Sequence, residues 1–327
     1  MKIFFYALRP YDELPYVEQF SKETGIEYGW TADYPNKDNM ELCRGSDVFS
    51  CIPCDMSAPV IDKLADLGIK WIACRSIGYN HVDLEECRKK GIRVSNVAYP
   101  PESVADYAIM CLLMGLRKAS HILKRSEAQD YSLKGKIGRE ISFLTVGVIG
   151  TGRIGTTLIR HLSGFGCRIL CYDPYPNKTA SQYATYTDLD TLLKEADAIT
   201  LHANVTKENT HLLNDDAFHK MKDGVLIVNT SRGLLIDTDA LVKAITSGKV
   251  GGAVLDVLEN ENGLYYYNRT GDVIDNKDMA LLRSFPNVTL LPHTAFYTEA
   301  SVKAMVEGCF QGAIAYRDGT KTPLEVL

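Results

Sequence analysis

The sequence of 327 residues has no long hydrophobic run. Nowhere does it approach the roughly 18 consecutive apolar residues that a membrane-spanning helix requires. Residues 1–9 include a short apolar stretch that stops at a charge and has no small-residue cleavage site, so they suit a first strand better than a signal peptide. Internal repeats and low-complexity linkers are missing as well. We therefore expect a globular protein with no membrane partner.

An excess of charge of one sign is also missing. The 36 Lys and Arg residues are interleaved with 41 Asp and Glu residues, for a net charge of -5. This distribution offers no basic stripe to nucleic acid and no cationic helix to a membrane surface. Small molecules are therefore the expected partners.

The nine cysteines favour a reducing compartment. Nine is an odd number, and several of them lie in apolar segments, as expected of core thiols in the cytoplasm rather than of a disulfide framework. Cys51 and Cys54 form one C-x-x-C pair, which neither a second pair nor neighbouring histidines accompany. We therefore predict no metal site.

What the sequence does contain is a regular alternation of β-branched runs with amphipathic helical stretches. This pattern is typical of parallel sheets covered by helices. In the first part of the chain, strands are expected at residues 2–8, 47–50, 71–74 and 93–96. Further along, strands are expected at residues 145–149, 168–172, 198–201, 225–229, 252–256 and 288–291. The predicted fold class is α/β, with two doubly wound parallel-sheet domains.

A hinge between the domains is expected at residues 99–101. Two prolines there prevent a strand from continuing, and the long apolar helical pattern of residues 104–116 follows. A last helical pattern begins at residue 298 and could return to the first domain. We predict a substrate domain of residues 1–101 and 298–327, into which a domain of residues 102–297 is inserted.

The strongest local motif is a glycine loop after the strand at residues 145–149. Gly150, Gly152 and Gly155 form G-x-G-x-x-G at the start of a helical pattern, and Asp173 ends the next strand. The first glycine permits a tight turn, the second lets a pyrophosphate approach the backbone, and the third lets the helix pack on the sheet. A carboxylate at residue 173 would bind ribose hydroxyls and repel a 2′-phosphate. The motif therefore predicts NAD as the cofactor, the alternative being a simple strand–helix turn.

Polar residues follow three later strands, at the edge where open α/β sheets bind ligands. Reduction of a 2-keto acid needs a cation for the carboxylate, an acid for the carbonyl oxygen and a group that keeps this acid charged. Arg232 has the planar fork for the first task, and His293 can donate a proton near neutral pH. Glu261 can hold the imidazolium, with Glu259 as the alternative partner.

These segments resemble the D-isomer-specific 2-hydroxyacid dehydrogenase family, particularly its D-lactate dehydrogenase branch. The similarity covers essentially the whole chain, and six motifs follow one another in the family's order. The motifs are residues 75–83, 96–99, 148–155, 229–233, 255–261 and 292–298. The resemblance implies a Rossmann NAD-binding domain inserted in a flavodoxin-like substrate domain. It also implies a homodimer whose interface involves the helical stretch from Ser103.

The resemblance implies roles for individual residues as well. Arg232, Glu261 and His293 match the family's catalytic triad. The matches for substrate binding are Ile77, Gly78, Tyr99 and Phe296. The matches for NAD binding are Gly150, Gly152, Arg153, Ile154, Gly155, Asp173, Ala203, Asn204, Asn209, Thr230, Ser231, Arg232 and Asp256. One departure lies at residues 202–204, where the family usually has a proline after the small residue.

The expected reaction is hydride transfer between NADH and a small 2-keto acid, but its substrate stays open. Pyruvate is the first choice because residues 2–9 and 293–298 resemble the D-lactate branch. Branched or aromatic keto acids, as in hydroxyisocaproate or phenyllactate dehydrogenases, are the alternative. A corepressor-like NAD-sensing interaction protein would have the same fold and triad, and turnover of NADH would separate the two classes. The tyrosines at residues 265–267 are interpreted as packing or as an insertion before the last strand.

Overall fold

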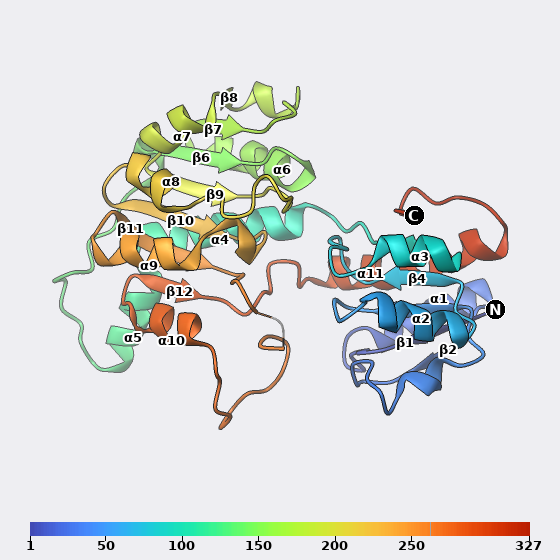
Figure 1. Cartoon of the computed structure of the whole chain (residues 1–327). Coiled ribbons are helices and arrows are strands. Elements are labelled where there is room, and N and C mark those ends of the chain that lie inside the picture. Colours follow the sequence, from blue (N-terminus) through green and yellow to red (C-terminus); the bar gives the residue numbers. More distant parts are fainter. Residues whose placement is uncertain (262) are drawn as a thin grey trace. The chain divides into compact units, whose positions relative to one another are not determined.

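The computed structural model describes residues 1–261 and 263–327. The chain forms two compact units (Figure 1), one of Met1–Pro100 with Tyr297–Leu327 and one of Pro101–Phe296. Each point of division lies one residue before the one expected from the sequence. None of the helices in the described part of the chain is long and apolar enough to cross a membrane.

The first unit contains a five-stranded sheet in the order β2-β1-β3-β4-β5, with every pair parallel. The strands are β1 Lys2–Phe5, β2 Glu27–Trp30, β3 Val48–Cys51, β4 Trp71–Cys74 and β5 Arg93–Ser95. The helices are α1 Leu14–Thr24, α2 Ala58–Asp66, α3 Leu84–Lys90 and α11 Glu299–Arg317. This strand order is the flavodoxin-like order, which confirms the expected fold class of this unit.

The end of the chain completes the core of the first unit. Helix α11 buries Phe310 beside Phe5 and Trp71 of the sheet. Gly312 makes this approach possible, because a Cβ there would lie 2.8 Å from the indole nitrogen of Trp71. The segment from Tyr297 therefore packs with the first unit, although some two hundred residues separate it from the rest of that unit.

A buried ion pair holds the ends of two strands in this unit. Arg75 and Glu13 have fully buried side chains, and the guanidinium Nε lies 3.0 Å from Oε1 of the carboxylate. The same guanidinium donates to the carbonyl oxygens of Tyr6 and Ala7 at 2.8 and 3.0 Å. Arg75 thus connects the end of β4, the end of β1 and the start of α1.

The second unit contains a seven-stranded parallel sheet in the order β12-β11-β10-β9-β6-β7-β8. The strands are β6 Thr145–Ile149, β7 Arg168–Tyr172, β8 Thr185–Tyr186, β9 Ala198–Leu201, β10 Val225–Asn229, β11 Val250–Leu255 and β12 Val288–Leu290. The helices are α4 Glu102–Leu116, α5 Ala119–Glu127, α6 Arg153–Leu162, α7 Leu189–Glu195, α8 Asp215–Lys220, α9 Thr238–Thr246 and α10 Lys277–Ser284. Counted from β6, this is the Rossmann order with one further strand, so the expected fold class is confirmed here too.

Two hydrophobic layers cover this sheet. Residues of α4 and α6 pack on one face, and residues of α7, α8, α9 and α10 pack on the other. The strand order reverses between β6 and β9 (Figure 1), and in open α/β sheets ligands bind outside the carboxyl ends of the strands at such a point. A ligand site is therefore expected at the loops that follow β6, β7, β9, β10, β11 and β12.

Side-chain caps explain where many of the helices begin. An Asp, Asn or Thr oxygen accepts a hydrogen bond from the backbone N–H three residues later, which satisfies a donor that the helix cannot pair. Such caps are Asp83, Asp188, Asn214, Asp237, Asn276 and Thr298. The last of these starts α11, and thereby the return of the chain into the first unit.

Candidate active site

The glycine loop connects β6 to α6, and two of its glycines are required by close contacts. Gly150 has a φ of 97°, and a Cβ there would lie 2.6 Å from the backbone nitrogen of Ala203. A Cβ at Gly155 would lie 2.0 Å from the carbonyl oxygen of Gly150. Gly152, the N-cap of α6, has no atom within 4 Å of its Cβ position. The loop is therefore packed on the protein side and open at the helix N-terminus, where a phosphate is favoured.

Asp173 lies beside this loop. Its Oδ2 accepts a hydrogen bond of 2.6 Å from the backbone nitrogen of Thr151, and its Oδ1 accepts one of 2.8 Å from that of Tyr175. The carboxylate at the end of β7 is thus tied to the backbone of the glycine loop. A second negative charge in this position, such as a 2′-phosphate, would be repelled.

The other residues predicted to bind the cofactor lie after β9 and β10. Ser231 Oγ donates to the carbonyl oxygen of Ala203 at 2.7 Å, and Asn209 Nδ2 donates to that of Asn204 at 2.7 Å. The hydroxyl of Thr230 is buried and has no hydrogen-bond partner among the described residues. An unpaired buried hydroxyl costs free energy, so a polar ligand at this loop fits the residues present.

Arg153 and Ile154 begin α6, directly after Gly152, and complete the glycine loop. Arg232 lies in a turn that Asn229 shapes from the end of β10. Asn229 is 1% exposed, and its side chain donates to the Arg232 carbonyl at 2.8 Å and accepts from the Ser231 nitrogen at 3.0 Å. This turn holds the backbone from which the guanidinium extends.

The centre of the site is a short hydrogen bond between His293 and Glu261. Nδ1 of the imidazole lies 2.6 Å from Oε1 of the carboxylate, and the two side chains are 26% and 22% exposed. The other oxygen of Glu261 accepts from the backbone nitrogen of Leu258 at 2.8 Å. Because an ionised carboxylate can only accept, Nδ1 carries the hydrogen of this bond, which leaves Nε2 for proton exchange.

A buried carboxylate fixes the backbone of the two residues that follow His293. Asp256 follows β11, is 0% exposed, and accepts from the backbone nitrogens of Thr294 and Ala295 at 2.9 Å each. Burial raises the pKa of Asp256 above its ordinary value, and these two hydrogen bonds act in the opposite direction. Asp256 thus accepts hydrogen bonds from the backbone of the two residues that follow His293, and its predicted contact with NAD stays a prediction.

Glu259 serves a different histidine. Its Oε1 lies 2.6 Å from Nε2 of His211, and its Oε2 accepts from the backbone nitrogen and the hydroxyl of Thr238 at 3.0 and 2.7 Å. The hydrogen bond to Glu259 raises the pKa of His211 above its ordinary value, against a smaller effect of burial. Of the two carboxylates left open by the sequence, the structure brings Glu261 to His293.

Arg232 lies close to the segment that carries both carboxylates. A Cβ on the next residue, Gly233, would lie 2.1 Å from the carbonyl carbon and oxygen of Leu258. The turn of Arg232 and Gly233 therefore packs directly on the backbone that precedes Glu259 and Glu261. Three loops, which follow β10, β11 and β12, thus meet at one edge of the sheet.

Tyr266 is a residue of this site that the sequence reasoning missed. Its ring lies 5.9 Å from the imidazole of His293 and 6.2 Å from the ring of Phe296, centroid to centroid, and the last two rings are 6.4 Å apart. Its hydroxyl donates to the carbonyl oxygen of His293 at 3.2 Å. The only sequence signal was its position five residues after Glu261 in a run of tyrosines.

The remaining substrate-binding candidates belong to the first unit. The backbone at Ile77 and Gly78 is held by side chains, because Asn96 Nδ2 donates to the Ile77 carbonyl at 2.8 Å and Ser76 Oγ donates to the Gly78 carbonyl at 2.6 Å. Tyr99 follows in the segment that leaves this unit. The contacts of these residues with substrate stay a prediction.

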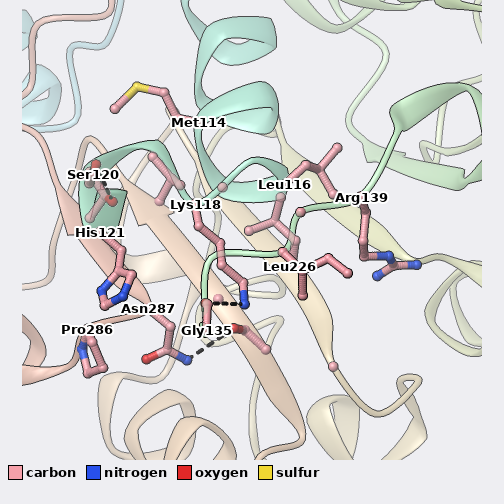
Figure 2. A pocket seen from close by; sticks show the side chains of 18 residues that line it. Met114, Leu116, Lys118, Ser120, His121, Gly135, Arg139, Leu226, Pro286 and Asn287 are labelled. Atoms are coloured by element: carbon pink, nitrogen blue, oxygen red, sulfur yellow. Dashed lines mark hydrogen bonds between the residues drawn. The ribbon is translucent and has the colours of Figure 1, made fainter. Parts of the chain in front are cut away.

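A cavity of about 540 Å³ lies near the amino ends of strands in the second sheet, opposite to the ends that carry these loops. It is lined by residues next to the amino ends of β10, β11 and β12, such as Gly224, Gly251 and Asn287, together with residues from the end of α4 to Arg139. Figure 2 shows Lys118 donating to the carbonyl of Gly135 at this cavity, at 3.1 Å. It is therefore separate from the loops described above.

No group of His, Cys, Asp and Glu in the described ranges could hold a metal ion.

Comparison with known proteins identifies the family. A sequence model of the NAD binding domain of D-isomer specific 2-hydroxyacid dehydrogenases matches residues 109–295, more than half of the chain. The chain belongs to the D-isomer-specific 2-hydroxyacid dehydrogenase family. It is an NAD-dependent oxidoreductase that interconverts 2-keto acids and D-2-hydroxy acids.

Relatives of this dehydrogenase match along nearly its whole length. It is 41% identical to an aromatic 2-oxoacid reductase of Clostridium sporogenes, over 94% of this chain and 93% of the relative. It is also 41% identical to a D-lactate dehydrogenase of Lactiplantibacillus plantarum, with the same coverage. The crystal structure of a D-isomer specific 2-hydroxyacid dehydrogenase from Lactobacillus delbrueckii ssp. bulgaricus, in its NAD complexed form, superposes with a TM-score of 0.86 at 31% identity over 100% of both chains. These matches favour an enzyme over the corepressor-like alternative.

Proposed function

We propose that His293 is the acid and base of the reaction and that Glu261 orients it through Nδ1. The observation that carries this proposal is the 2.6 Å bond between Nδ1 and Oε1. Bound NADH supplies a hydride to the carbonyl carbon of the keto acid. His293 donates its Nε2 proton to the carbonyl oxygen, so that a hydroxyl group forms, and it takes this proton back in the reverse reaction.

Arg232 is proposed to bind the carboxylate of the substrate. A planar guanidinium can donate two parallel hydrogen bonds to a carboxylate, and a cation beside the carbonyl oxygen stabilises the negative charge that develops there during hydride transfer. The hydrogen bonds of Asn229 hold the backbone of the turn from which this side chain extends. Arg232→Lys should raise KM and lower kcat at every pH, because an ammonium cannot reproduce the paired geometry.

For the cofactor, we propose that Gly150, Gly152, Arg153, Ile154 and Gly155 receive the pyrophosphate. Asp173 then receives the ribose hydroxyls. The remaining contacts with the cofactor are assigned to Ala203, Asn204, Asn209, Thr230, Ser231 and Asp256. Three observations support this assignment. Gly152 is open, Asp173 has a carboxylate that would repel a 2′-phosphate, and the buried hydroxyl of Thr230 has no partner among the residues that the structure describes.

Pyruvate is the substrate that we propose, with D-lactate as the product. Residues 2–9 and 293–298 resemble the D-lactate branch, and one relative at 41% identity carries that name. The second candidate is an aromatic keto acid, because another relative at 41% identity is named as an aromatic 2-oxoacid reductase. Comparison of kcat/KM for pyruvate, 2-ketoisocaproate and phenylpyruvate with NADH tests the choice, and a higher value for phenylpyruvate overturns it.

We further propose that two copies of the chain form a homodimer through the helical stretch from Ser103 and the segment that follows it. Large apolar side chains are exposed there, namely Leu123 at 62%, Tyr131 at 77%, Leu133 at 88%, Ile137 at 83% and Phe143 at 83%. Exposed apolar groups gathered on one segment are typical of an interface, and the cavity of Figure 2, which Ile137 lines, could receive side chains of a second copy. Leu133→Glu with Ile137→Glu should give a monomer in sedimentation, and an unmodified protein that sediments as a monomer overturns the proposal.

A cytoplasmic location is proposed from the nine cysteines, all of which are free.

A further inference from the structure

The loop that carries Glu261 contains a residue under backbone strain. Tyr266 has a φ of 70°, in the left-handed region that side chains other than glycine rarely adopt. Such a conformation is strained and persists only where surrounding contacts enforce it. Two further residues of the site, Asn260 with a φ of 56° and His293 with a φ of 55°, share this conformation.

The two residues before Tyr266 anchor this loop in the core. Leu264 is 9% exposed and Tyr265 is 8% exposed, and both pack in the cluster beneath β10 and β11. The left-handed turn at the next residue directs the ring of Tyr266 to His293 instead of into this core. Tyr266 itself stays 49% exposed, so burial of its ring is not what stabilises the turn.

Three contacts join Tyr266 to His293 and its neighbour Phe296. Its hydroxyl donates to the carbonyl oxygen of His293, and its ring lies beside the imidazole and forms a T-shaped pair with the ring of Phe296. Glu261 fixes Nδ1 of the same imidazole, and Asp256 fixes the backbone of the two residues that follow it. The side chain of His293 is thus held at one nitrogen and flanked by two rings.

We propose that Tyr266 is a positioning residue that holds the His293 imidazole at the angle needed for proton transfer. The bond from Glu261 alone leaves the ring free to tilt about that bond. The Tyr266 ring limits the tilt, and its hydroxyl maintains the left-handed backbone of His293. This inference rests on the proposed acid–base role of His293.

The test uses Tyr266→Asn, Tyr266→Phe and the control Tyr267→Asn in the full-length enzyme. Asparagine tolerates the left-handed backbone, so it removes the ring without adding strain. Tyr267 is 44% exposed, and the guanidinium carbon of Arg269 lies over its ring, 5.0 Å from the centroid. Because small misplacements of reacting groups can lower rates by up to about a hundredfold, we expect kcat to fall about tenfold in Tyr266→Asn. Tyr266→Phe, which keeps the ring, should recover most of this loss, and Tyr267→Asn should match the unmodified enzyme.

The readout that separates positioning from folding is the solvent deuterium isotope effect on kcat. A misplaced acid makes proton transfer slower and thus more rate-limiting, so the isotope effect should rise in Tyr266→Asn and not in Tyr267→Asn. Loss of folded enzyme lowers kcat without changing the isotope effect, and NADH binding stoichiometry counts the folded molecules. KM for the keto acid should change less than twofold.

Two outcomes overturn the inference alone. One is an unchanged kcat and isotope effect in Tyr266→Asn, and the other is a raised KM at unchanged kcat, which would assign Tyr266 to substrate binding. If Tyr266→Asn does not bind NADH, Tyr266→Leu takes its place: an isotope effect above that of Tyr266→Phe supports the role of the ring, and an isotope effect equal to that of Tyr266→Phe overturns it. His293→Asn separates the two proposals, because an enzyme that keeps its kcat without this imidazole overturns the acid–base role itself.

Discussion

Glu261→Gln is the substitution that tests the centre of the proposed mechanism most directly. Glutamine has the same length and keeps an oxygen that can accept from Nδ1 of His293, so the geometry of the 2.6 Å contact can survive. Only the negative charge is lost. Since an ionised acceptor forms a stronger hydrogen bond than a neutral one, Glu261→Gln should hold the imidazole less firmly and lower kcat.

The size of this decrease follows from the hydrogen bond that is weakened. The side chains of His293 and Glu261 are only 26% and 22% exposed, so water can replace little of what the carboxylate contributes. Replacing a charged acceptor by a neutral one costs roughly 1 to 2 kcal/mol, so kcat should fall by roughly tenfold.

The assay is a measurement of kcat and KM for pyruvate with NADH, with Glu259→Gln as the matched control. Glu259 lies two residues away and binds His211 and Thr238, so its substitution should leave kcat unchanged. NADH binding should be nearly unchanged in both variants. If Glu259→Gln lowered kcat while Glu261→Gln did not, the partner of His293 would be wrongly assigned.

Three further predictions concern the cofactor and stability. Asp173→Ala should narrow the gap in kcat/KM between NADH and NADPH, because it removes the charge that repels a 2′-phosphate; an unchanged ratio would contradict this. Glu13→Gln should lower the free energy of unfolding by about 3 to 5 kcal/mol, since it leaves Arg75 buried without its partner, whereas the exposed Glu18→Gln on the same helix should be neutral in urea titrations. Burial lowers the pKa of His202 to about 4 from an ordinary value near 6.5. The unfolded chain therefore binds this proton first, and stability should fall by about 2 to 3 kcal/mol as the pH drops through that interval. His202→Asn should reduce this dependence of stability on pH. An equal pH slope in the variant and the unmodified protein would refute the reasoning.

The sequence predicted most strands of both sheets but missed β2 and β8. Both are edge strands, and β8 has only two residues, so neither provides a periodic hydrophobic pattern. In β2, Glu27 and Trp30 are exposed and the two residues between them are half-buried. Pairing with β1 and β7, which lie elsewhere in the chain, is what makes these segments strands.

The candidate site shows the same division. The glycine loop could be identified from the sequence because its requirements are local, and the structure gives Gly150 and Gly155 the close contacts that exclude a side chain. The partner of His293 could not be chosen between two glutamates two residues apart. Asn260, between them, has a φ of 56°, in the left-handed region. On either side of this turn the two carboxylates bind different histidines, Glu259 binding His211 and Glu261 binding His293.

The amino-acid sequence by itself determined the α/β alternation, the dinucleotide loop and the residue types needed for hydride and proton transfer, because these depend on periodicity and on short spacings. The tertiary structure decided which carboxylate meets His293, and it brought Tyr266 to the imidazole and buried Asp256 behind it. These contacts join loops that follow different strands, and parallel pairing of those strands places the loops at one edge of the sheet. No spacing along the chain encodes such a meeting, since it depends on how the whole sheet is assembled.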